Sequence, residues 1–387
     1  KDNEIQFQAM ARGGKSLYGK ADYNNLKCFD FVMGTCGLGN FSNNELQKAL
    51  LGKQANVGVG LGQYYQYLSG FSVPKDIETL MQLIYLNFTA VSKDEDNYKS
   101  TMAMVAQSLK NKGLSPEAAF GDSLTCAIYN HDARYTPLEE ADLAHISYDR
   151  ILQIQKERFA NASQFTFYFV GNFDEATIRP LIEKYIGALP KGKASKWVSA
   201  DPIAKGIVNV NFNRKAETPK AMASDLPMDY NIENVVLADA AGQALSMVYL
   251  KTIREDASAA YSVGAYGSVS RMGDKAFVQI FDQCPMDYNK AELALSLLEG
   301  GMKDCDKYID ADKVEKIKAN MLKNLDEELK TNGYWLNVMD EYNETGVDLY
   351  TTHRAAIESL TPAKIVAFLK KVVASNNHIQ VVMLPEL

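Results

Sequence analysis

The sequence is poor in histidine, the commonest metal ligand, with only four histidines in 387 residues. These are His131, His145, His353 and His378, and none has a second histidine and a glutamate at H-x-x-E-H or H-E-x-x-H spacing. The five cysteines include no C-x-x-C pair. We therefore expect no metal ligand in this chain, and we interpret the histidines as ordinary surface, loop or strand-edge residues.

Three further absences narrow the function. No uninterrupted apolar run approaches about 18 residues, so no membrane span is predicted. The net charge of −7 comes without a basic block, which gives nucleic-acid binding no electrostatic support. There is no G-x-S-x-G motif, and the glycines of Gly58–Gly62 precede a second strand rather than a helix, which argues against a phosphate-binding loop.

The cysteines and the first residues bear on the origin of the chain. The cysteines are odd in number and scattered, mostly in apolar segments, so we expect buried free thiols. Lys1 leads directly into a strand pattern without an initiator methionine. We interpret the chain as a piece of something longer or as a processed product.

Length and composition predict a soluble protein of more than one domain. The chain is 47% hydrophobic and 23% charged, which excludes disordered and collagen-like classes. At about 150 residues per domain, 387 residues suggest two or three domains. Residues 188–206 are rich in Pro, Gly and Lys and have no periodicity, so we predict a linker at 191–205 between an α+β unit at 1–190 and another at 206–387.

Apolar periodicity predicts the elements of each unit. The predicted strands are 4–11, 57–62, 65–73, 165–170, 207–212, 221–228, 261–270, 276–283 and 379–383. The predicted helices are 23–33, 44–51, 77–86, 95–110, one opened by 115–117, 146–159, 175–186, 231–255, 290–303, 310–330 and 360–373.

The two halves repeat at an offset of a little over two hundred residues. The matching pairs are Val59-Gly60 with Val263-Gly264, Pro74–Asp76 with Pro285–Asp287, and Asn161–Ser163 with Ser375–Asn377. We therefore predict an α+β protein of two homologous domains, each an antiparallel sheet with helices packed mainly on one face.

Arg254 and Tyr261 are the candidate functional residues. They lie seven residues apart on either side of a predicted helix-to-strand turn, an arrangement suited to holding another chain. The alternative is structural: Arg254 pairs with Glu255 or Asp256 or caps its own helix, and Tyr261 simply packs. On side-chain chemistry alone the structural interpretation is favoured.

Several segments resemble one protein family. Residues 253–271 resemble the Arg-x6-Tyr signature in the last domain of the pitrilysin and insulin-degrading type of zinc metallopeptidase, the inverzincins. Residues 329–338 are similar to a helix-end sequence of bacterial members. The segments that resemble the third domain are 37–39, 46–48, 71–83 and 165–174. The resemblance covers essentially the whole chain.

The resemblance implies a place for this chain in a larger enzyme. Family members have four similar domains in two halves that close around a peptide, and this chain resembles the C-terminal half, domains three and four. The zinc site, an H-x-x-E-H helix with a distal glutamate, belongs to domain one, so zinc is expected in the absent N-terminal half. In the family, the residues that match Arg254 and Tyr261 bind substrate backbone and help stabilise the tetrahedral intermediate. The small residues 257–260 would leave room for that backbone.

With the resemblance included, the functional interpretation of Arg254 and Tyr261 is favoured over the structural one. We expect the non-metal-binding C-terminal half of a zinc metalloendopeptidase, inactive alone, with a peptide substrate and with the N-terminal half of the same polypeptide or a separate subunit as partner. Two alternatives stay open: a catalytically inactive scaffold or assembly subunit of the same fold, and a stand-alone peptide-binding module that adds a strand at a sheet edge. Many Gram-negative relatives imply the periplasm or the cell envelope.

Overall fold

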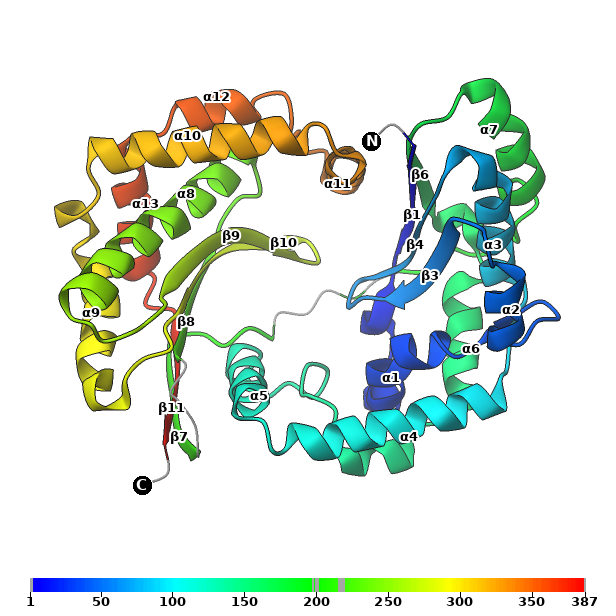
Figure 1. The fold of residues 1–387 in the computed structure, drawn as a ribbon, viewed down its shortest axis with the longest axis horizontal. Helices are drawn as coiled ribbons and strands as arrows, with labels where there is room; N and C mark the ends of the chain where they lie inside the picture. The colour runs from blue at the N-terminus through cyan, green and yellow to red at the C-terminus, as the bar shows by residue number, and fades with distance from the viewer. Residues whose placement is uncertain (1–2, 197, 199–201, 215–219, 386–387) are drawn as a thin grey trace. The chain divides into compact units, whose positions relative to one another are not determined.

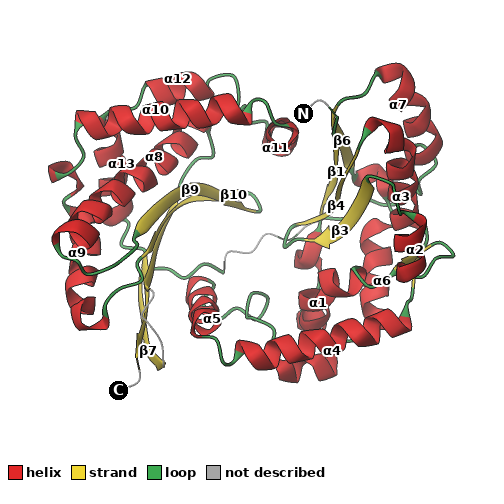
Figure 2. Ribbon diagram, viewed as in Figure 1, coloured by secondary structure: helices red, strands yellow, loops and turns green. Residues whose placement is uncertain are grey.

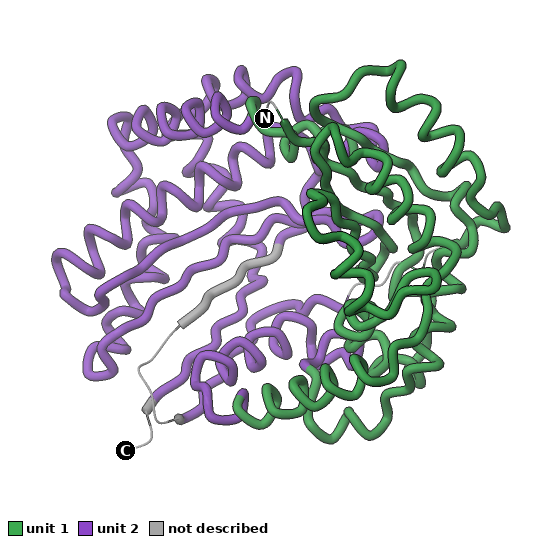
Figure 3. The backbone as a smooth tube through the Cα atoms, turned by 45° about the vertical axis from the view of Figure 1, so that its right-hand side comes forward, with its two compact units in different colours: residues 1–111, 138–200, 329–340 green, residues 112–137, 201–328, 341–387 purple. Residues whose placement is uncertain are grey.

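The computed structural model describes residues 3–196, 198, 202–214 and 220–385, and its chain forms two compact units (Figures 1 and 3). Unit 1 comprises residues 1–111, 138–200 and 329–340. Unit 2 comprises residues 112–137, 201–328 and 341–387. Each unit therefore includes a segment that is distant in sequence from the rest of it.

Unit 1 is built on a four-stranded antiparallel sheet with strand order β3-β4-β1-β6. Its strands are β1 (Ile5–Arg12), β3 (Ala55–Leu61), β4 (Tyr65–Ser72) and β6 (Thr166–Gly171), and a small pair joins β2 (Gly37–Leu38) to β5 (Val91–Ser92). Along β1, Ile5, Phe7 and Ala9 are buried and alternate with half-buried polar neighbours. One face of the sheet thus carries the core, as the period of two dictates.

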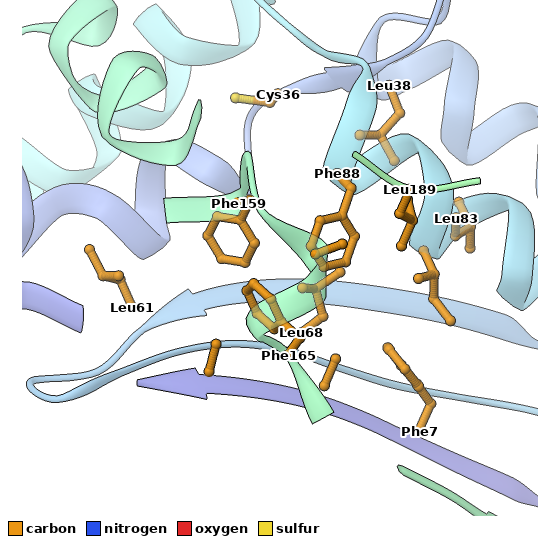
Figure 4. Packing of buried hydrophobic residues seen from close by; sticks show 14 of the residues in the cluster. Phe7, Cys36, Leu38, Leu61, Leu68, Leu83, Phe88, Phe159, Phe165 and Leu189 are labelled. Carbon is orange, nitrogen blue, oxygen red and sulfur yellow. The ribbon is translucent and has the colours of Figure 1, made fainter. Parts of the chain in front are cut away.

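The helices of unit 1 cover that core face. They are α1 (Tyr23–Met33), α2 (Asn43–Ala49), α3 (Ile77–Thr89), α4 (Glu95–Lys112), α6 (Tyr148–Phe159) and α7 (Glu175–Leu181), which continues as a π-helical turn, Ile182–Ile186. Apolar stripes of α1, α3 and α6 join β1 in one cluster. At its centre, Phe88 meets Phe159 and Phe165 edge to face (Figure 4).

Unit 2 is built on a five-stranded sheet with strand order β7-β11-β8-β10-β9. Its strands are β7 (Ile207–Arg214), β8 (Lys220–Pro227), β9 (Gly264–Met272), β10 (Lys275–Gln283) and β11 (His378–Pro385). All pairings are antiparallel except that of β7 with β11, which is parallel and was not anticipated from the sequence. A parallel neighbour needs a long crossover, and here almost the whole unit lies between the two strands.

Most helices of unit 2 lie on one face of its sheet (Figure 2). They are α5 (Pro116–Ile128), α8 (Ile232–Tyr249), α9 (Ala291–Lys303), α10 (Ala311–Glu328), α12 (His353–Glu358) and α13 (Pro362–Ala374), together with the last turn of α11 (Asn332–Thr345). The α8 helix is buried on nearly all sides, because it lies between the sheet and the helices α10 and α12.

The predicted repeat is confirmed by the strand order. The order β9-β10-β8-β11 of unit 2 reproduces β3-β4-β1-β6 of unit 1, with the same antiparallel pairings, and β7 is an addition to the second copy. The α+β fold of two homologous domains, each with helices mainly on one sheet face, is therefore confirmed.

The second face of each sheet is partly covered by a helix from the other half of the sequence. In unit 2, Phe120 and Ala127 of α5 pack against Ile379, Val381 and Met383 of β11. In unit 1, residues 332–340 of α11 lie over β1, where Asn332 Nδ2 donates to the Glu4 carbonyl oxygen at 3.4 Å. The boundaries of the two compact units therefore differ from the boundaries of the two repeated halves of the sequence.

Two helices, α11 and α12, were not predicted from the sequence. Leu336 is the one buried residue of α11 among those that the structure describes, so the helix has no apolar stripe to reveal it. The predicted boundaries 1–190, 191–205 and 206–387 stay a prediction. Residues 197 and 199–201 of the predicted linker lie outside the described residues. No helix among the described residues has the length and apolarity that crossing a membrane requires.

Candidate peptide-binding site at the end of α8

The site begins where α8 changes its hydrogen-bond pattern. Asn231 caps the helix by accepting from the Asn234 amide at 2.9 Å, and α-helical geometry continues to Tyr249. Leu250–Asp256 then form a π-helical turn rather than the continuous α-helix predicted from the sequence. Such wide turns alter the direction in which the following side chains project, and Arg254 projects from this one into solvent.

A tight turn then leads from the helix toward β9. Ser258 adopts a left-handed backbone conformation with φ +49°, which is unusual for a residue other than glycine. The Ala259 amide donates back to the Ile253 carbonyl at 2.9 Å, and Ala260 forms a β-bridge with Met286. The turn is therefore held at both ends by backbone hydrogen bonding.

The small residues of this turn do not lie where the sequence suggested. Ala259 and Ala260 are buried, at 0% and 9% exposure, so the expectation that they leave surface room for a peptide backbone is wrong for these two. These two alanines lie against the connection from β10 to α9, where a larger side chain would not fit. Only Ser258 is exposed, with Ala257 half-buried.

Lys290 braces the same turn from the start of α9. Its ammonium group donates to the carbonyl oxygens of Ala257 at 3.0 Å and Ser258 at 2.9 Å. The Asp287 amide donates to the Ala259 carbonyl, also at 3.0 Å. A cation that satisfies the last carbonyl groups of a helix both caps it and opposes its dipole.

Lys290→Met should loosen this turn without unfolding unit 2. We expect amide hydrogen exchange at Ala257, Ala259 and Asp287 to accelerate about tenfold, because two charge-assisted hydrogen bonds are lost at a partly exposed site. Lys303→Met at the other end of α9, where the side chain bonds the exposed Glu299, is the control. Equal exchange rates in the two variants would show that Lys290 does not brace the turn.

Arg254 and Tyr261 are brought together by this turn. The Arg254 guanidinium carbon lies 5.4 Å from the centroid of the Tyr261 ring, a cation–π contact, and Tyr261 is 87% exposed. Among the described residues, neither the guanidinium nor the phenol hydroxyl has a hydrogen-bond or ion-pair partner. Glu255 and Asp256 pair with Lys251 instead. The ion-pair alternative for Arg254 is therefore not what the structure shows.

The strand that follows Tyr261 is fixed against α8. The Ser246 hydroxyl accepts from the Ala265 amide at 2.7 Å and donates to the Ala265 carbonyl at 2.8 Å, which satisfies both backbone groups of a residue on an edge strand. Farther along, Gly242 and Gly267 allow the helix and the strand to touch, since a Cβ atom on Gly242 would lie 2.3 Å from the Gly267 nitrogen.

A buried pair supports the base of α8. Tyr249 is fully buried, and its hydroxyl lies 3.2 Å from Asp282 Oδ2 and 3.1 Å from the Leu298 carbonyl oxygen. Burial, and next the Asp282 carboxylate, raise the pKa of Tyr249 well above its usual value. The phenol thus stays protonated and donates across the interior, which anchors the helix that carries Arg254.

The described residues contain no group of three or more His, Cys, Asp or Glu side chains placed to hold a metal ion. His131 and His145 are exposed, and His353 is half-buried near Asp239, whose charge opposes the effect of burial on the pKa of His353. Burial is the larger effect, and it lowers the pKa of His353. The described side chains of this chain therefore do not fit a zinc site.

Comparisons with known proteins show similarity to zinc peptidases. Residues 145–321, which include Arg254 and Tyr261, match the family described as peptidase M16 inactive domain. The matched segment is a little under half of the chain. It is 23% identical to the probable zinc protease PqqL of Escherichia coli over 274 residues, 69% of this chain and 29% of that protein. The resemblance to the C-terminal half of a pitrilysin-type peptidase is thereby confirmed.

Solved structures of peptidases share the fold of essentially the whole chain. The periplasmic protease PqqL from Escherichia coli superposes with a TM-score of 0.81 at 19% identity, over 99% of this chain and 43% of that one. A mutant of the ferredoxin protease FusC, in complex with Arabidopsis ferredoxin, gives 0.82 at 17% identity, over 99% and 42%. A peptidase M16 inactive domain from Pseudomonas fluorescens gives 0.79 at 14% identity, over 100% and 94%. The chain thus spans less than half of PqqL and FusC.

Proposed function

We propose that this chain is the metal-free C-terminal half of a zinc endopeptidase and that it holds the peptide substrate. The M16 assignment and the fold support the coarser statement, a protease-like half of the inactive type. The finer statement rests on one observation. Arg254 and Tyr261 lie together on a braced turn, exposed and with no polar partner among the described residues.

The two side chains offer the donors that an extended peptide needs. The Arg254 guanidinium presents several N–H groups in a planar fork, which suits the carbonyl oxygens of a peptide backbone. The Tyr261 hydroxyl presents one O–H group, which stabilises the carbonyl oxygen of the cleaved bond as that oxygen gains negative charge. Because both side chains are exposed, a peptide reaches them without rearrangement of the turn.

The remaining parts of the enzyme lie outside this chain. An N-terminal half, on the same polypeptide or as a separate subunit, would hold the zinc, with no ligand from the residues described above. We place the protein in the periplasm or cell envelope, by analogy with the Escherichia coli protease PqqL, which is described as periplasmic.

The isolated chain should cleave no peptide. We expect a mixed library of unfolded peptides to stay intact with the chain and added zinc, as followed by mass spectrometry, because no described residues build a metal site. Cleavage should appear when an N-terminal half with an H-x-x-E-H helix is supplied. Zinc-dependent cleavage by the isolated chain, in a sample checked for contaminating protease, would contradict the proposal.

The same experiment separates the other functions. An assembly scaffold would leave the library intact even with the N-terminal half present, and Arg254→Ala would change nothing. A stand-alone binding module would hold peptides as tightly without the N-terminal half as with it, which calorimetry measures.

A further inference from the structure

A cavity of about 500 Å³ lies along β9, beyond the pair formed by Arg254 and Tyr261. We call it the Tyr266 pocket. Its walls come from α8, β9 and α10, including Met247, Tyr266 and Ile317, with Asp239, Lys316 and Asn320 also lining it. Its volume falls within the range of about 300–1,000 Å³ typical of small-ligand sites.

The lining favours an uncharged, apolar group. Met247, Ile317 and the Tyr266 ring supply apolar surface, while the Lys316 ammonium group is already paired with Asp312 and the Asp239 carboxylate already accepts from Gln243. The polar amides already serve the protein, since Asn320 Nδ2 donates to Gln243 Oε1 at 3.0 Å and Gln243 Nε2 donates to Asp239 Oδ1 at 3.1 Å. A charged group would thus enter without compensation, whereas an aliphatic or aromatic one would gain contact area.

The Tyr266 pocket lies within a few peptide residues of Arg254 and Tyr261. Met247 precedes Arg254 by about two helical turns, roughly 10 Å at 1.5 Å per residue. An extended peptide advances about 3.3 Å per residue, so roughly three residues span that separation. Tyr266 lies on the strand that follows Tyr261 and is 66% exposed, so the strand leads from one place to the other.

We propose that the Tyr266 pocket is a specificity subsite that takes one leucine-sized or aromatic side chain of the substrate, about three residues from the bond held at Arg254 and Tyr261. The proposal rests on the proposed function, since it needs a peptide held by that pair. It adds a preference for an apolar residue at one position, which the pair alone does not provide.

Uncharged alanine-rich hexapeptides, acetylated and amidated at their ends, test the subsite. Each peptide carries one leucine, at successive positions along the series, and methyl NMR of the chain reports binding through the Met247 signal, assigned by Met247→Leu. We expect one leucine position to bind about tenfold tighter than the all-alanine peptide and to shift the Met247 signal. An unmoved Met247 signal, or no binding at millimolar peptide, overturns the proposal.

A blocking variant and its neighbour make the test specific. Asn320 is exposed and lines the pocket, so Asn320→Trp should fill it and abolish the leucine preference without disturbing the core. Asn324→Trp, one turn along α10 and also exposed, should keep the preference. Tyr266→Ala removes one wall and should reduce the preference. A leucine preference that survives Asn320→Trp contradicts the subsite.

Arg254→Ala separates the subsite from the proposed function. It should weaken all peptides alike and leave the leucine-to-alanine ratio unchanged. An unaltered affinity with an intact ratio would reject the role of Arg254 and keep the pocket. If Arg254→Ala lowers the affinity for all peptides but Asn320→Trp leaves the leucine-to-alanine ratio unchanged, the role of Arg254 is kept and the pocket is rejected.

Discussion

Tyr261→Phe should lower kcat of the complete peptidase by about 10²- to 10³-fold with little change in KM, the usual cost of removing one donor to a developing oxyanion. The phenylalanine ring retains the stacking surface that lies 5.4 Å from the Arg254 guanidinium carbon. The lost hydroxyl has no partner among the described residues, so the fold should be unaffected. Steady-state kinetics on a fluorogenic peptide measure the effect.

Tyr308→Phe is the matched control for that variant. Tyr308 is another exposed tyrosine of unit 2, at 36% exposure, and follows the far end of α9 from the braced turn. It should leave both kinetic constants unchanged. An unaltered kcat/KM in Tyr261→Phe would reject a transition-state role for Tyr261 and return the pair to a structural interpretation.

Gly242→Ala should destabilise unit 2 by about 3 kcal/mol, the upper part of the range for overpacking a tight interior contact. The added Cβ atom would lie 2.3 Å from the Gly267 nitrogen, and backbone cannot yield as a side-chain tip does. Conversely, a Cβ atom on Gly267 would lie 1.8 Å from the Ala238 carbonyl oxygen. Chemical denaturation with unchanged m-value would measure the loss.

Gly300→Ala provides the opposite expectation in the same unit. Gly300 is also helical, but a Cβ atom there meets nothing within 4 Å. The gain in helix propensity should then stabilise the protein by about 0.5–1 kcal/mol. If Gly242→Ala stabilised the protein as much, α8 and β9 would not be in the close contact described above.

Much of the fold was predictable because its pattern is local. Alternation along β1 and β10, and the 3.6-residue period of α3 and α9, are written in apolar spacing alone. The parallel pairing of β7 with β11 was not predictable, since residues far apart in the sequence meet there and no local signal records it. The α11 helix escaped for a different reason: it packs on a polar sheet face and needs no apolar stripe.

The candidate site, like the fold, was predicted only in part from the sequence. The resemblance selected Arg254 and Tyr261, and the structure places them in contact, while their roles stay a prediction. Lys290 was missed because it is distant from Tyr261 in the sequence and its partners are backbone carbonyls, which carry no side-chain signature. The buried positions of Ala259 and Ala260 were misjudged because small side chains suit both a buried turn and an open surface.

The exchange of helices between the two halves of the sequence bears on how the chain matures. During synthesis, the sheet of unit 1 is complete once β6 has emerged, yet residues 329–340 that cover β1 are made only long afterwards. Until then, the face of β1 that carries Gln6 and Gln8 is available to other segments or chaperones. A fragment that ends before the linker would keep that face exposed permanently and would also leave Phe120 and Ala127 of α5 without β11. Expression of residues 1–190 alone should therefore give an aggregation-prone product.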